Sequence, residues 1–100
     1  MRVITNITTS PATTTLIARK NKSDGNIRKI TIANFSDHAD GATVNLFLQN
    51  AAAADFYLFK NVVIPKGVSL MFNDNIRFGS VYSLKMYSTG TSPALTVMIK

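Results

Sequence analysis

The stretch that decides the fold is Thr43–Gln49, which reads TVNLFLQ. Its apolar residues Val44, Leu46 and Leu48 alternate with Asn45 and the other positions. Successive side chains of a β-strand point to opposite faces of the sheet. The alternation therefore predicts a strand that buries these three apolar side chains and turns Asn45 outward.

Similar runs extend from this stretch in both directions and are separated by Gly, Pro, Asn and Asp turns. The further expected strands are Arg2–Thr8, Thr13–Arg19, Ile27–Phe35, Phe56–Ile64, Val68–Phe72, Ile76–Phe78, Val81–Tyr87 and Leu95–Ile99. No connection is long enough for the helical crossover that parallel strands need. We therefore predict an all-β fold, a single antiparallel β-sandwich that is jelly-roll-like and has about eight short strands.

Local signals add detail to this prediction. Asp24-Gly25 is a hairpin signal, and it predicts that Thr13–Arg19 pairs with Ile27–Phe35. We expect one domain over residues 1–100, with residues 1–12 as an extended N-terminal arm. The Thr-rich stretch Thr8–Thr15 is expected to become ordered only on docking. A strand irregularity is expected near Lys60 and Asn61. The expected core consists of Ile30, Ile32, Leu46, Leu48, Leu70, Phe72, Leu84, Leu95 and Val97.

Length and composition argue against an enzyme. A chain of 100 residues can bury one core but not a core and a roomy substrate cleft. Without cysteine, thiolate metal sites and cysteine nucleophiles are excluded. The single histidine, His38, lies between Asp37 and Asp40, but no further ligands follow at a metal-binding spacing, so we interpret this cluster as a polar loop. We predict no catalytic residues, no metal and no cofactor.

The first residues lack the continuous apolar stretch of a secretory signal, and no run approaches the roughly 18 apolar residues of a membrane span. This pattern favours a protein that is made in a cytoplasm and either used there or carried out inside a particle. Membrane partners are not expected.

Basic residues gather around the predicted hairpin turn. With 11 Lys and Arg against 5 Asp, the chain carries a net charge of +6. The gathered residues are Arg19, Lys20, Lys22, Arg28 and Lys29. They form either a positive surface that binds phosphate or an acidic protein, or a solvated hairpin tip that resists pairing edge to edge. Nucleic acid is the less favoured partner because no aromatic side chains interleave with these residues.

Aromatic residues occur in runs where a small sandwich cannot bury both strand faces. Tyr57 and Tyr82 are the candidates for a partner-binding surface. The alternatives are that both simply lie on a half-exposed sheet face, or that exposed aromatic rings form a sugar-binding platform, which the absence of Trp disfavours.

Two pairs of segments define the order of strands and turns over residues 27–100. In the first, Ile30–Ser36, with its Asn-x-Ser ending, precedes the Val-x-Leu strand of Ala42–Leu48. In the second, Phe56–Phe59 leads through the Ile-Pro-x-Gly turn of Val63–Leu70 to the closing strands Ser83–Met86 and Leu95–Ile99. This order of strands and turns resembles small β-sandwich virion proteins of tailed bacteriophages.

This resemblance implies a non-enzymatic virion structural protein, first of all a capsid decoration or cement protein that binds the head shell in many copies. Its partners would be other virion proteins and further copies of the chain, and it would be located in the virion after assembly in the host cytoplasm. A neck or tail component and a module that binds carbohydrate or a host surface are the alternatives.

Overall fold

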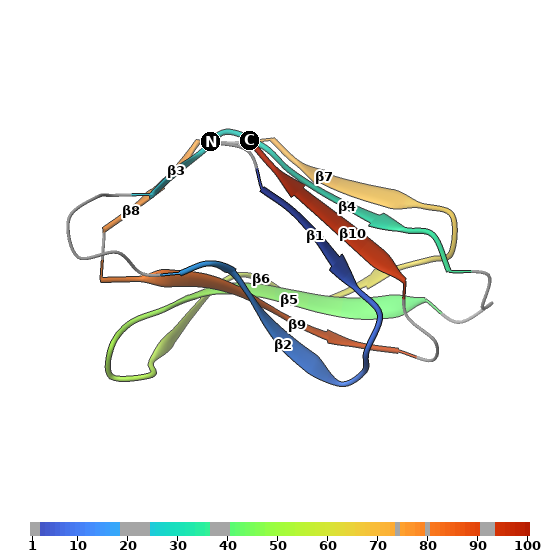
Figure 1. Cartoon of the computed structure of the whole chain (residues 1–100), viewed down its shortest axis with the longest axis horizontal. Coiled ribbons are helices and arrows are strands. Elements are labelled where there is room, and N and C mark those ends of the chain that lie inside the picture. Colours follow the sequence, from blue (N-terminus) through green and yellow to red (C-terminus); the bar gives the residue numbers. More distant parts are fainter. Residues whose placement is uncertain (1–2, 19–24, 37–40, 74, 80, 91–93) are drawn as a thin grey trace.

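Two four-stranded antiparallel sheets face each other in the computed structural model, which describes residues 3–18, 25–36, 41–73, 75–79, 81–90 and 94–100 (Figure 1). One sheet has the order β1-β10-β4-β7, the other β2-β9-β5-β6, and a two-stranded ribbon pairs β3 with β8. The strands are β1 (Val3–Ile7), β2 (Ala12–Ile17), β3 (Gly25–Ile27), β4 (Ile30–Asn34), β5 (Ala42–Gln49), β6 (Asp55–Ile64), β7 (Ser69–Phe72), β8 (Ile76–Phe78), β9 (Ser83–Thr89) and β10 (Leu95–Ile99). The predicted all-β antiparallel sandwich is confirmed.

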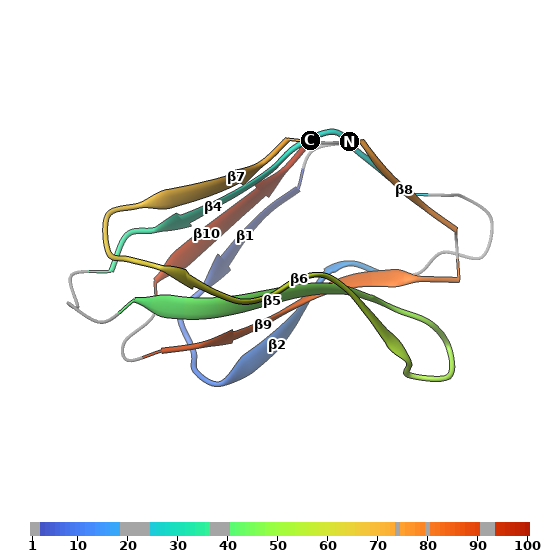
Figure 2. The same ribbon diagram turned by 180° about the vertical axis from the view of Figure 1, so that it is seen from behind.

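The strand pairs are nested along the chain. β5 pairs with β6, β4 with β7, β3 with β8, β2 with β9 and β1 with β10, and the further pairs β10–β4 and β9–β5 complete the two sheets. A long hairpin rolled up in this way is a jelly roll. Eight strands form the two facing sheets, and the β3–β8 ribbon extends the fold at one end, as both views show (Figures 1 and 2).

Alternation along the strands fills the space between the sheets. Leu46, Leu84 and Val97 are fully buried there, and the whole buried cluster draws on both sheets and on the β3–β8 ribbon. Of the predicted core, Ile30, Ile32, Leu46, Leu84, Leu95 and Val97 are buried, and Leu48, Leu70 and Phe72 are partly buried against the cluster. Burial of apolar surface contributes about 25 cal/mol per Å², so this shared interior is the main stabilising feature.

Two of the sequence predictions are wrong. The expected hairpin of Thr13–Arg19 with Ile27–Phe35 does not form, because β2 pairs with β9 and β4 pairs with β10 and β7. The expected N-terminal arm is wrong for residues 3–7. These residues form β1, which pairs with β10 from Val3 to Ile7 and so belongs to the sandwich.

The irregularity expected near Lys60 and Asn61 is present. Val44 lies opposite Val62 but Leu46 lies opposite Phe59, so β6 carries an extra residue at this point. Asn61 takes up the bulge with a φ of 57°, and its backbone N–H donates to Asn45 Oδ1 at 2.8 Å. Asparagine is one of the few residues that tolerate this left-handed conformation.

Replacing Asn61 by Val is expected to lower the free energy of unfolding by about 1–2 kcal/mol, because a β-branched residue is strained at positive φ. Replacing it by Gly is expected to leave stability within about 0.5 kcal/mol of the original, since Gly adopts this conformation readily and the bond to Asn45 uses the backbone. Thermal unfolding of both variants measures the difference. Equal melting temperatures for the Val and Gly variants would contradict this account of the bulge.

Candidate protein-binding surface

The outer face of the β1-β10-β4-β7 sheet carries an apolar row that crosses all four strands. The pairing register places Ile4 opposite Met98, Met98 opposite Thr31, and Thr31 opposite Met71. The side chains of Ile4, Met98 and Met71 are 62%, 43% and 55% exposed. These three large apolar side chains are aligned by register, so they form one continuous surface, which we call the apolar row (Ile4, Met98, Thr31 and Met71).

Two lysines lie beside the middle of the apolar row, at the end of the sheet where β4 begins and β10 ends. Lys29 and Lys100 exchange backbone hydrogen bonds, with Lys100 N–H donating to Lys29 O at 3.0 Å and Lys29 N–H donating to Lys100 O at 3.3 Å. They are therefore directly opposite each other, one step beyond the Ile99–Ile30 pair. Each lies two residues from a member of the row, so both side chains share its face of the sheet.

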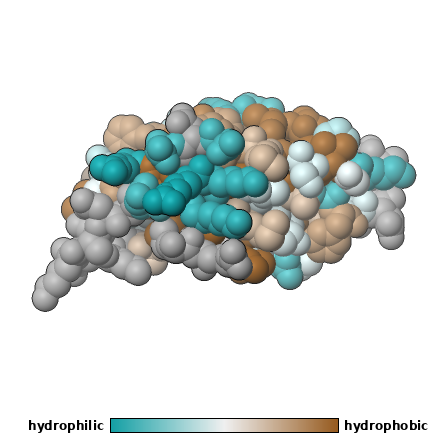
Figure 3. Space-filling view, turned by 90° about the horizontal axis from the view of Figure 1, so that it is seen from above, coloured by the Kyte–Doolittle hydropathy of each residue, from teal (hydrophilic) through white to brown (hydrophobic). Residues whose placement is uncertain are grey.

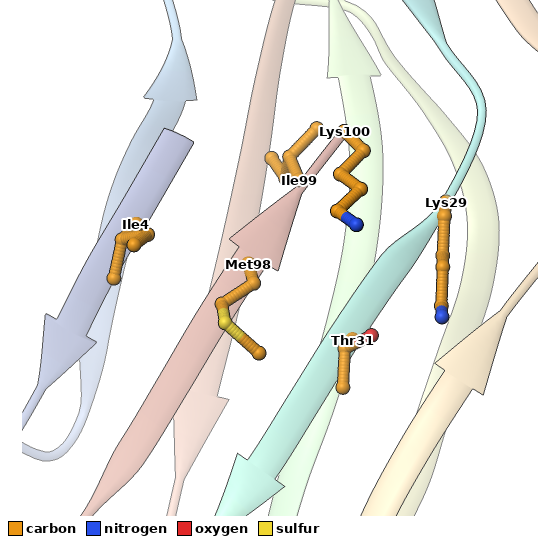
Figure 4. A pocket seen from close by; sticks show the side chains of 6 residues that line it. All are labelled: Ile4, Lys29, Thr31, Met98, Ile99 and Lys100. Atoms are coloured by element: carbon orange, nitrogen blue, oxygen red, sulfur yellow. The ribbon is translucent and has the colours of Figure 1, made fainter. Parts of the chain in front are cut away.

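The lysines and the row enclose a shallow pocket of about 300 Å³. The residues around it are Ile4, Lys29, Thr31, Met98, Ile99 and Lys100 (Figure 4). The Thr31 side chain is shorter than those of Met98 and Lys29. The pocket lies over Thr31, between these two longer side chains. Seen from above, hydrophilic side chains gather toward one end of this face, and apolar and neutral ones cover much of the other (Figure 3).

The outer face of the β2-β9-β5-β6 sheet has a different character. Phe47 is buried there, with its ring 5.4 Å from that of Tyr57, and Lys60 Nζ lies 4.8 Å from the centre of the Tyr57 ring. Lys85 Nζ donates to Gln49 Oε1 at 2.7 Å, and Gln49 Nε2 donates to Asp55 Oδ1 at 2.9 Å. Lys60 and Lys85 thus both have partners within this face, which leaves less charge for a ligand to compensate.

Tyr57 and Tyr82 lie on opposite faces of this sheet. Tyr57 is opposite Phe47 on the outer face, whereas the Tyr82 ring packs edge-on against Phe56 with the ring centres 6.0 Å apart. Phe56 is opposite Leu48, and the side chains of Leu48 and Tyr82 both pack against the core. Tyr82 therefore lies on the inner side of the sheet. The two candidate tyrosines therefore do not share a surface.

Of the basic candidates, Arg28 and Lys29 lie in the connection between β3 and β4, where Arg28 N–H donates to Lys100 O at 2.7 Å. Arg19, Lys20 and Lys22 lie outside the described residues.

Four residues of the candidate surface were missed from the sequence, namely Ile4, Met71, Met98 and Lys100. They occupy alternate positions that look like any solvent-facing strand residue, and only the register reveals that they adjoin.

Catalytic and metal-binding groups do not come together in the part of the chain that the structure describes. Asp55 is the one acidic side chain within it, His38 lies outside it, and no group of three potential metal ligands occurs among its residues. The same residues include no helix that is long and apolar enough to cross a membrane.

No protein-family model and no curated protein matches the chain. Solved structures of infectious bursal disease virus do match. A chain of the Gx strain aligns over 99% of this chain and 33% of its own length, with 13% identity and a TM-score of 0.44. A chain of the Gt strain aligns over 99% of this chain and 30% of its own length, with 12% identity and a TM-score of 0.47. A chain of the T=1 particles derived from this virus aligns over 99% of this chain and 29% of its own length, with 10% identity and a TM-score of 0.48. The chain thus spans about a third, or less, of the length of these chains.

Proposed function

We propose that this chain is a non-enzymatic structural subunit of a virus particle, and more narrowly a decoration or cement protein on the head of a tailed bacteriophage. The observation that carries the proposal is the apolar row, which crosses the four strands on one sheet face and has a lysine pair beside its middle. Exposed apolar surface of this extent is typical of a protein–protein contact. The resemblance of residues 27–100 to small virion proteins gives the contact a context.

A flat, rigid surface suits repeated binding to a shell better than it suits catalysis. The row lies on four paired strands, so its backbone is held in place before binding, and little backbone ordering entropy opposes the contact. A symmetric shell offers many equivalent sites, so the subunit would bind it in many copies. The partners in this proposal are the major shell subunit and neighbouring copies of the chain.

The cement role is tested with particles assembled without this chain. They are expected to release their genome at a lower temperature than complete particles, and purified chain added back is expected to restore the original temperature, because a ligand that binds only the intact shell stabilises it. Equal release temperatures with and without the chain, and no binding on add-back, would contradict the cement role. Binding of the isolated chain on a glycan array, without binding to particles, would support the carbohydrate-binding alternative instead.

A further inference from the structure

Among the described residues, the lysine pair beside the apolar row has no Asp or Glu neighbour on its own sheet. None of the four strands β1, β10, β4 and β7 contains Asp or Glu, and Asp55, the acidic residue among those described, belongs to β6 in the other sheet. Like charges directly opposite each other on neighbouring strands destabilise a sheet. The described strands of this sheet supply no acidic side chain to offset the repulsion between Lys29 and Lys100, whereas an anionic partner would gain from both ammonium groups.

The neighbourhood of the lysines indicates the kind of anion. Their pocket is completed by the side chains of Ile4, Met98 and Thr31, so a ligand that fills it needs an apolar group within a few ångströms of its negative charge (Figure 4). A carboxylate side chain next to an apolar residue in a polypeptide has this combination. A nucleic-acid backbone offers phosphates but no apolar side chain for the row.

The length of the row sets the size of the ligand. From Ile4 to Met71 the row crosses three strand spacings, which is roughly 14 Å at about 4.8 Å each. An extended segment of about four residues, at about 3.3 Å each, covers this distance.

From these observations we infer that the outer face of the β1-β10-β4-β7 sheet binds a short acidic and apolar segment of the shell subunit. The segment lies along the apolar row from Ile4 to Met71, and a carboxylate near its middle contacts Lys29 and Lys100 on β4 and β10. An apolar side chain next to that carboxylate enters the pocket. This inference rests on the proposed function, since the partner is a protein of the same particle.

Zero-length carbodiimide cross-linking of intact particles tests the carboxylate contact, because it joins a lysine amine only to a carboxylate that touches it. Mass spectrometry is expected to find Lys29 and Lys100 joined to Asp or Glu residues of one short segment of the shell subunit. Lys66, an exposed lysine in the turn between β6 and β7, is the matched control and is expected to remain unlinked. Links from Lys66 but none from Lys29 or Lys100 would overturn the inference.

Binding of purified variants to particles that lack the chain tests the charge and the apolar contact separately. Lys29→Gln with Lys100→Gln, and the uncharged change Met98→Gln, are each expected to weaken binding about tenfold or more, whereas Lys66→Gln keeps the original affinity. All these positions are solvent-facing or half-buried, and the melting temperature of each variant shows whether it folds.

The outcomes separate the inference from the proposed function. If the unaltered chain does not bind particles, the proposed function fails. If it binds and the double lysine variant binds equally well, the inference alone fails. If binding depends on the lysines and on salt but Met98→Gln binds normally, the contact is with phosphate groups and the inference is also overturned.

Discussion

Leu46→Asp is expected to leave the chain unfolded at room temperature. Leu46 is fully buried on β5, which lies between β6 and β9 and pairs through this residue with Phe59 and Met86. Loss of the leucine side chain alone costs about 2–5 kcal/mol, and an unpaired buried carboxylate adds several kcal/mol. A small domain has a total stability of about 5–15 kcal/mol, so the sum removes most or all of it.

The matched control is Met98→Asp. Met98 also lies on a strand with neighbours on both sides, but its side chain is on the outer face of the other sheet. This variant is expected to fold with a melting temperature within a few degrees of the original. Circular dichroism and thermal unfolding compare the two. A folded Leu46→Asp protein with an unchanged melting temperature would show that the register of β5 is wrong.

The second large effect is expected at Asn34, whose buried amide joins the two sheets. Its Nδ2 donates to Ile64 O at 2.8 Å, and its Oδ1 accepts from Ser36 N–H at 3.1 Å. Its backbone bonds to Gly67 and Val68 hold the same turn, in which the chain passes from β6 in one sheet to β7 in the other. One residue therefore fixes the point where the chain changes sheets.

Asn34→Ala is expected to lower the free energy of unfolding by about 2–3 kcal/mol, because it leaves the buried Ile64 carbonyl without its donor. In a domain of this size the melting temperature then falls by on the order of 10–20 °C. Asn6→Ala is the control: this exposed asparagine accepts a bond from Thr96 Oγ1, and its loss is expected to cost under about 1 kcal/mol. Equal melting temperatures for the two variants would contradict the role given to Asn34.

A charge at the same position makes the effect depend on pH. In Asn34→Asp, burial and the facing Ile64 carbonyl raise the pKa of the new carboxyl above the ordinary value of about 3.9. Its folded-state pKa exceeds its unfolded-state pKa, so the folded form binds the proton more tightly. The stability that protonation contributes is present below the unfolded-state pKa and is lost as pH rises through the folded-state pKa. The gap in melting temperature between this variant and the original is therefore expected to be smaller at pH 4 than at pH 7.

The fold class could be predicted because burial of one strand face leaves its period in the sequence. Thr43–Gln49 agrees with β5 to within one residue, and the expected core faces inward. Strand partners could not be predicted in the same way. The nested topology gives β2 the partner β9 and β4 the partners β7 and β10, and these pairings follow from burial of both sheets at once. Asp24-Gly25 indicates a turn but cannot choose the strands on either side of it.

The candidate site was predictable only in part for the same reason. Lys29 was found from its charge, but its neighbours on the surface come from three other segments of the chain, at Ile4, Met71 and the pair Met98 and Lys100. Asn34 is a case where a local signal existed. The Asn-x-Ser ending matches the bond from Ser36 N–H to Asn34 Oδ1, a turn that asparagine forms with its own backbone.

The measurement that tests the central claim most directly is the number of copies of this chain in gradient-purified particles, determined by quantitative mass spectrometry against the major shell subunit. A decoration or cement role predicts copies comparable with those of the shell subunit. A small, ring-like number would contradict that role and favour the neck or tail. Absence from the particles would contradict the claim that the chain is a structural subunit of a virus.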